Sequence, residues 1–328
     1  SHYPEARRCY EESLAICRAH GDPAGEALAI NQIAWINRVE GRTREAIDMG
    51  QQALQLARKL HNKRIEMSAL SGLGLCYQTI AQPDEAIQCF SEGIAIASSL
   101  GDRTSEGINR GNIALVYRDQ NQMQLAIEFS KEALSIAREV GNRRNQGAQL
   151  GNLGRTYQIM GQLEKALECT TEALAIAQEI DCPEHELVAL GNLASILMNQ
   201  GRLQESIFHN KRAIEIAEAI GDRKNKSTFL GNLGLVYETE KQLDLALSCF
   251  MEALKDAEEL SDQVSVCIHL GNIGNLFHKT QRFDEAESAM RSAIATADTC
   301  LPPAAGAFRG SLALLLSEKG CLEEAKTE

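Results

Sequence analysis

The sequence predicts an all-α protein, an α-solenoid of stacked antiparallel helix pairs. Three observations support this fold class. A motif that includes a Gly-Asn pair recurs at intervals of 40 residues, apolar residues recur at helical spacing inside each interval, and glycine with Asp or Asn separates the apolar stretches. A constant period of this length is typical of repeat proteins in which each repeat buries its apolar face against its neighbours.

Small residues recur at fixed places in each repeat, and the stretch 151–181 is a clear copy. Because small side chains let two helix backbones approach closely, we expect these positions to form the contact between the paired helices. The three series are Ala34, Gly74, Ala114, Gly154, Ala194, Gly234 and Gly274; Ala46, Ala86, Ala126, Ala166, Ser206, Ala246 and Ala286; and Ala57, Ala97, Ala137, Ala177, Ala217, Ala257 and Ala297.

Each repeat contains two helical patterns. Leu153, Tyr157 and Met160 share one face of the first, and the apolar residues of the second start at Leu163. Turn residues separate the helices, with Gly-Asp or Gly-Asn at 21–22, 101–102, 141–142 and 221–222. Glycine suits the left-handed residue after a helix end, and Asp or Asn suits the N-cap of the next helix.

We expect one solenoid domain over residues 1–328. Residues 1–20 read as a lone second helix, seven full repeats occupy 21–300, and 301–328 form a partial eighth repeat. Leu301-Pro302-Pro303 replaces the usual turn and predicts a one-residue deletion. Neither end carries a polar capping helix, so we expect this chain to be a fragment of a longer protein.

The motif Leu153-Gly154-x-x-Tyr157, followed by Ala166 and Ala173, resembles the tetratricopeptide repeat. It returns as Leu233-Gly234-x-x-Tyr237 and as Leu73-Gly74-x-x-Tyr77. The usual repeat has about 34 residues, so the 40-residue period is similar to the long repeats of kinesin light chains and of Pins/LGN spindle-orientation scaffolds. The resemblance implies that the first helices of all repeats line a concave wall.

Asparagine occupies one position of this wall in five successive repeats. A carboxamide donates and accepts hydrogen bonds, as a peptide group does, so the row could clamp the backbone of an extended peptide. Alternatively, each amide bonds to the next helix or to its own backbone and fixes the stacking. We expect the glycine before each asparagine to let a ligand approach the helix. The row is Asn112, Asn152, Asn192, Asn232 and Asn272.

Beside the asparagine row, the wall varies from repeat to repeat. Its N-terminal half offers apolar and basic side chains, which would suit an acidic-apolar peptide segment. These candidate binding residues are Trp35, Leu75, Leu115, Arg38, Arg118 and Arg155.

Composition excludes several classes of function. The net charge of −12 argues against a general nucleic-acid or anionic-membrane surface. No apolar run reaches about 18 residues, and no signal peptide is evident. The ten cysteines include no CxxC pair. Those that recur, such as Cys89 and Cys169, stand two repeats apart, which is too far for a disulfide. We therefore expect reduced thiols and a cytoplasmic location.

No catalytic, metal-binding or cofactor-binding motif is present. None of the seven histidines forms an HExxH motif, and the Gly-rich strings lie inside helices rather than after strands. The sequence therefore predicts a non-enzymatic scaffold without cofactors, which binds a peptide or helix of a partner protein. The alternative is a sensor or regulatory arm of a larger signalling protein, linked to a nucleotide switch or a protease, which binds a small ligand or restrains its own effector domain.

Overall fold

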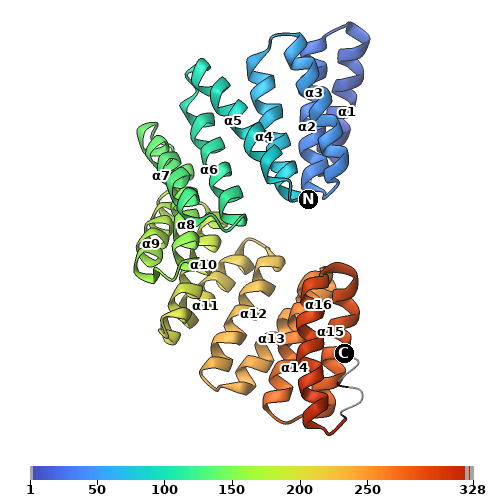
Figure 1. Ribbon diagram of the computed structural model, residues 1–328, viewed down its shortest axis with the longest axis vertical. Helices are drawn as coiled ribbons and strands as arrows, with labels where there is room; N and C mark the ends of the chain where they lie inside the picture. The colour runs from blue at the N-terminus through green and yellow to red at the C-terminus, as the bar shows by residue number, and fades with distance from the viewer. Residues whose placement is uncertain (1–2, 322–324, 326–328) are drawn as a thin grey trace. The chain divides into compact units, whose positions relative to one another are not determined.

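The structure is a computed structural model that describes residues 3–321 and residue 325 (Figure 1). It divides into two compact units, Ser1–Ile176 and Ala177–Glu328, called unit 1 and unit 2. Every regular element in the described residues is an α-helix, and consecutive helices pack as antiparallel pairs within each unit. The predicted fold class, an all-α solenoid of stacked helix pairs, is therefore confirmed.

The helices of unit 1 are α1 (Tyr3–His20), α2 (Pro23–Val39), α3 (Thr43–Lys59), α4 (Lys63–Thr79), α5 (Pro83–Leu100), α6 (Arg103–Asp119), α7 (Met123–Glu139), α8 (Arg143–Ile159) and most of α9 (Leu163–Glu179). Those of unit 2 are α10 (Pro183–Asn199), α11 (Leu203–Ala219), α12 (Arg223–Thr239), α13 (Leu243–Glu259), α14 (Gln263–Lys279), α15 (Phe283–Cys300) and α16 (Pro302–Glu318). None of these helices is long and apolar enough to cross a membrane.

The helices begin at periodic positions. From α2 to α15, each helix starts 20 residues after the helix before it. α16 instead begins at Pro302, 19 residues after Phe283. Proline is favoured at this first helical position. The backbone N–H of a residue there has no partner within the helix, so proline, which lacks the N–H, loses no hydrogen bond. The expected start of a further helix falls on residues 322–324 and 326–328, outside the described residues.

The turns between the helices share one backbone conformation, except the turn at Leu301 between α15 and α16, where φ is −150°. The first turn residue is left-handed, with φ between 49° at Asp181 and 79° at Gly41. Glycine fills this place in seven turns, as predicted, and seven others use a residue with a side chain, such as Ala81. The following residue donates its N–H back to the helix end, as Asp102 does to the Ala97 carbonyl at 2.9 Å. This bond satisfies a carbonyl that the helix leaves free.

Side-chain caps distinguish the turns that join two repeats from the turns inside a repeat. Before the first helix of a repeat, an Asp or Asn side chain accepts a backbone N–H of the first turn, as predicted; these caps are Asp22, Asn62, Asp102, Asn142, Asp222 and Asp262. Before second helices such as α3, α5 and α7, no side-chain cap bond forms. Cys182 and Leu301 also lack one, and a proline follows each of them.

The small-residue series form the contact between paired helices, as expected. A Cβ atom built on Gly74 would lie 2.6 Å from the Phe90 ring, and one on Gly234 would lie 2.5 Å from the Phe250 ring. Both rings are fully buried. The core of each unit therefore lies between the first and second helices and depends on the absence of side chains at these positions.

Within each unit, the first helices also lie next to one another. In unit 1 these are α2, α4, α6 and α8, and in unit 2 they are α10, α12, α14 and α16. These first helices carry the rows of positions singled out in the sequence. We call the surface formed by these positions the first-helix face of each unit.

Candidate functional site

The asparagine row lies on the first-helix faces, with Asn112 and Asn152 in unit 1 and Asn192, Asn232 and Asn272 in unit 2. All five side chains are half-buried. Among the described residues, none of the five amides forms a hydrogen bond. Their polar atoms are also absent from the buried, unpaired groups of the described chain. The amides therefore remain able to donate and accept toward a ligand.

Other asparagines on the first helices behave differently. Asn31 donates through Nδ2 to Ser68 Oγ at 2.9 Å, and Asn109 Oδ1 accepts from Ser71 Oγ at 2.9 Å. Asn109 is almost fully buried. These two join neighbouring first helices, which is the structural role that the sequence left open for the asparagine row.

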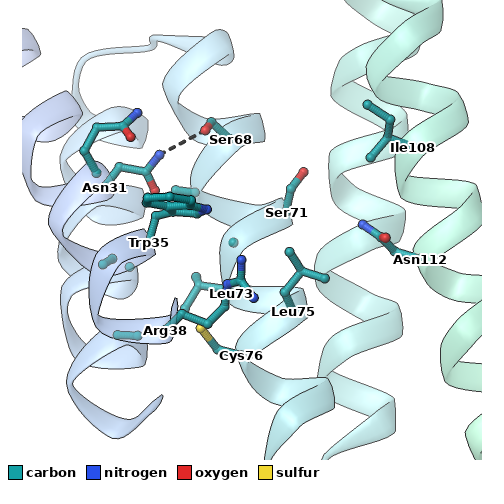
Figure 2. A pocket seen from close by; sticks show the side chains of 16 residues that line it. Asn31, Trp35, Arg38, Ser68, Ser71, Leu73, Leu75, Cys76, Ile108 and Asn112 are labelled. Atoms are coloured by element: carbon teal, nitrogen blue, oxygen red, sulfur yellow. Dashed lines mark hydrogen bonds between the residues drawn. The ribbon is translucent and has the colours of Figure 1, made fainter. Parts of the chain in front are cut away.

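Four of the predicted binding residues meet at one cavity in unit 1. Trp35 and Arg38 come from α2, Leu75 from α4 and Asn112 from α6, and the cavity holds about 240 Å³. Figure 2 shows α2 on one side and α6 on the other, with α4 between them. We call this the Trp35 cavity. Its full lining is Asn31, Gln32, Ala34, Trp35, Arg38, Ala46, Gly50, Ser68, Ala69, Ser71, Gly72, Leu73, Leu75, Cys76, Ile108 and Asn112.

The Trp35 ring is 45% exposed and forms part of the cavity wall. Tyr3, at the start of α1, packs against it edge to face, with 5.9 Å between the ring centroids. Such aromatic pairs add stability beyond the area they bury. Tyr3 therefore helps to hold the indole in place while leaving much of the ring accessible.

Arg38 is the charged group of the cavity. Its Nε is buried and has no hydrogen-bond partner, and the guanidinium forms no ion pair with any residue in the described part of the chain. Cys76 lies beside it (Figure 2). Burial raises the pKa of the Cys76 thiol, and the positive charge of Arg38 acts in the opposite direction.

The remaining predicted residues of unit 1 do not line this cavity. Leu115 and Arg118 are half-buried on α6, and Arg155 is exposed on α8. Arg118 lies 3.5 Å from a carboxylate oxygen of its neighbour Asp119. Of the predicted binding residues in unit 1, the structure therefore brings Trp35, Arg38, Leu75 and Asn112 together and leaves Leu115, Arg118 and Arg155 outside the cavity.

The expectation for the glycines before the asparagines is corrected by the packing. A Cβ on Gly191 would lie 2.9 Å from the Phe229 ring, and one on Gly231 would lie 2.7 Å from the His269 ring. Gly111 is blocked in the same way by Gln149. At these positions, and at Gly271 beside Phe308, a side chain of the next first helix takes the space, not a ligand. Gly151 is the exception, because a Cβ on it would meet no atom within 4 Å.

Sequence reasoning missed a row of exposed apolar residues on the same helices. Leu28 and Ile108 are 48% and 43% exposed in unit 1, and Val188 is 60% exposed in unit 2. Their 80-residue spacing is visible in the sequence, but we interpreted only the positions next to the asparagines. Ile108 lines the Trp35 cavity and extends its apolar wall.

The groups that line the cavity define what it can do chemically. In the described residues, no group of three or more His, Cys, Asp and Glu side chains could hold a metal ion. The cavity combines an aromatic ring, aliphatic side chains, one cation and amides. This arrangement can bind, and it contains no nucleophile paired with a base.

The family model of the tetratricopeptide repeat matches residues 2–59, 27–99, 104–179, 185–259 and 226–299. These overlapping matches cover most of the chain. The comparison with curated proteins gave no match.

Several solved structures have a similar fold. The apo form of the quorum sensor NprR from B. thuringiensis gives a TM-score of 0.73 at 16% identity, over 89% of this chain and 83% of that chain. A Signal Transduction ATPase with Numerous Domains from Pyrococcus horikoshii, which has a tetratricopeptide repeat sensor, gives 0.69 at 16% identity, over 96% and 50%. A putative kinesin light chain from Podosopora anserina with nearly identical TPR-like repeats gives 0.52 at 20% identity, over 62% and 98%. At these identities the similarity shows the fold alone.

Proposed function

The chain belongs to the tetratricopeptide-repeat family, and on this premise we propose that it is a non-enzymatic scaffold that holds an extended peptide segment of a partner protein on the first-helix face of a unit. The family fold is a binding scaffold whose repeats present a row of equivalent positions to a ligand. The proposal assigns the asparagines of the row on that face to the backbone of the peptide.

The observation that carries the proposal is that the side-chain amides of the asparagine row form no hydrogen bond with any described residue. Each carboxamide in the row keeps a donor and an acceptor that no described residue uses. An extended peptide carries N–H and C=O groups that need such partners when water is displaced. An amide with a purely structural role would be bonded, as Asn31 is to Ser68.

A sensor or regulatory arm of a larger signalling protein is the second candidate function. It draws on the fold shared with the quorum sensor and with the ATPase that has a repeat sensor. The Trp35 cavity favours a peptide side chain over a drug-sized small molecule, because pockets for such molecules hold about 300–1,000 Å³. A peptide ligand is compatible with both functions, so the experiment below tests the ligand class first.

The proposal is tested with short random peptides displayed on phage and selected on the purified chain. Selected sequences are then synthesised and titrated against wild type and the Asn112→Ala, Asn152→Ala double variant. If each amide makes one neutral bond, worth about 0.5–1.5 kcal/mol, the double variant loses about five-fold to 150-fold in affinity. Its thermal stability is expected to persist, because Ala is a better helix former than Asn.

Asn109→Ala is the matched control. This asparagine lies on the same helix as Asn112 but is buried and bonded to Ser71, so its loss is expected to lower stability and leave the affinity of the folded protein unchanged. The reverse pattern, with lower stability and unchanged affinity in the double variant, would assign the row to stacking and refute the backbone clamp.

A further inference from the structure

The Trp35 cavity lies where the asparagine row begins, at Asn112. Gly72 stands on α4 at the position that Asn112 occupies on α6 and Asn152 on α8. Beneath it, Gly50 of α3 replaces the large side chain that Phe90 provides in the next repeat. Gly50 lets Leu73 pack close to α3, since a Cβ on Gly50 would lie 2.9 Å from Leu73 Cδ2. Two glycines therefore stand where the following repeats carry Phe90 and Asn112.

The fold gives no packing reason for Gly72. This residue lies in the interior of α4, and a Cβ atom built on it would meet no atom within 4 Å. Gly74, two residues later, has such a reason, because the Phe90 ring fills the space beside it. Glycine weakens a helix interior relative to alanine. Gly72 lines the cavity, and a glycine leaves room there for a ligand to approach the helix backbone, which would explain the residue.

Arg38 gives the cavity a charge that the protein leaves unpaired. An arginine N–H buried without a partner is unfavourable, and a carboxylate is the acceptor that fits a guanidinium well. The acidic side chain nearest in sequence, Glu40, is already engaged by Arg7 and Arg42. The equivalent residue Gln78 of the next repeat carries no charge. A positive site of this kind is complementary to an acidic ligand.

Large apolar side chains surround this charge. Trp35 and Ile108 are 45% and 43% exposed, and Leu75 lies between them on α4 (Figure 2). Covering them with an apolar group would remove apolar area from water, which favours binding. The volume of about 240 Å³ limits the occupant to about one side chain.

We propose that the Trp35 cavity receives a bulky apolar side chain of the bound peptide, and that the carboxylate of an adjacent internal Asp or Glu pairs with Arg38. This inference rests on the proposed function and names the peptide chemistry that the site selects. Gly72 leaves space for the entering side chain, and Asn112 at the cavity edge continues the contact along the peptide backbone.

The test uses selected peptides that lack tryptophan and are blocked at both ends. Trp35 is the only tryptophan of the chain, so its emission reports occupancy of the cavity directly. Gly72→Asn restores the side chain of the repeat, and Arg38→Gln copies the neighbouring repeat. Each variant is expected to weaken binding about ten-fold or more, because one blocks entry and the other removes a charged partner.

Gly310→Asn and Arg212→Gln are the controls. A Cβ on Gly310 meets no atom within 4 Å, and Arg212 is exposed on the second helix α11, outside the cavity, so both are expected to bind as wild type does. Changing the peptide's acidic residue to its amide is expected to weaken binding to wild type and to have little further effect on Arg38→Gln.

Three outcomes contradict the inference. If no peptide is selected, the proposed function and the cavity assignment both fail. If peptides depend on Asn152 but tolerate Gly72→Asn and Arg38→Gln, the proposed function stands and the cavity assignment fails. If only peptides with a free C-terminal carboxylate change the Trp35 emission, the assignment of an internal Asp or Glu as the partner of Arg38 fails.

Discussion

Ser227 and His269 form a hydrogen bond between neighbouring first helices of unit 2, with 3.0 Å between Oγ and Nε2. Ser227 Oγ also donates to the Ala253 carbonyl at 2.8 Å. The serine therefore accepts from His269, which places the proton of the neutral ring on Nε2. The other nitrogen, Nδ1, is buried and has no partner in the described chain. Burial lowers the pKa of His269, and the Asp262 carboxylate partly offsets this.

We expect stability to fall in mild acid because of this histidine. Its folded-state pKa lies below the ordinary 6.5, so the folded state binds fewer protons than the unfolded state below that pH. The stabilisation is complete above about pH 6.5 and is lost as the pH falls toward the folded-state pKa. Thermal unfolding between about pH 7.5 and about pH 5 measures the loss, since most carboxylates titrate below this window.

His269→Phe is the matched variant for this prediction. Phe229 and Phe308 occupy the same position on α12 and α16, next to glycines of the preceding first helices. The variant is expected to flatten part of the acid slope. His209, whose pKa burial also lowers, contributes to the slope that remains. An unchanged slope in His269→Phe would show that this ring does not control acid stability.

Filling a small position in the helix contact is expected to destabilise the chain. A Cβ on Gly154 would collide with Thr170 Oγ1 and lie 3.3 Å from the Ala166 carbonyl oxygen. Gly154→Leu should lower the free energy of unfolding by about 1–3 kcal/mol or more. Gly310→Ala, in open space on α16, should instead raise it by about 0.5–1 kcal/mol. Urea unfolding of both variants measures these changes. If Gly154→Leu were as stable as wild type, the close contact of the paired helices at this position would be refuted.

A glycine is expected to stabilise turns that now use a residue with a side chain. Ala81 is held at φ 56°, a left-handed conformation that costs a residue with a Cβ atom about 1–2 kcal/mol. Glycine avoids this cost, but it also has more conformational entropy in the unfolded chain, which offsets part of the gain. Ala81→Gly should therefore raise the free energy of unfolding by about 0.5–1 kcal/mol. Gly101→Ala, at φ 67°, is the reverse control and should lower it. Equal melting temperatures would contradict this account.

The thiols are expected to remain reduced and to differ in reactivity. Burial raises the pKa of Cys89 to about 11, and the neighbouring Glu92 carboxylate adds to the effect. Alkylation requires the thiolate, so Cys89 should react much more slowly than the exposed Cys9. Mass spectrometry of timed alkylation without reductant measures both points. An intramolecular disulfide in the native protein would contradict the reducing, cytoplasmic location that the sequence predicts.

The periodic sequence predicted the helices because the same local signals recur with the period. The turn at Gly101-Asp102 could be read directly, since glycine and the cap residue each have one physical role there. The turn at Ala81 carried no such signal. Its left-handed residue follows from the spacing of the helices on either side, which tertiary packing imposes.

The candidate site was only partly predictable. Trp35 and Arg38 could be placed on one face by helical spacing and by the family resemblance. The cavity could not be foreseen, because it depends on the open space beside Gly72 and on the unpaired state of Arg38. Four of the five glycines before the asparagines were misinterpreted, because residues about 38 positions later, such as His269 beside Gly231, fill their space.

The unequal capping of the turns predicts where helices fray first. A side-chain cap is worth about 1 kcal/mol, and it holds the first turn of α2, α4, α6, α8, α12 and α14. Second helices such as α3 and α5 lack this cap, as do α10 and α16. We therefore expect the first turns of these uncapped helices to exchange their amide hydrogens with solvent sooner than those of the capped helices.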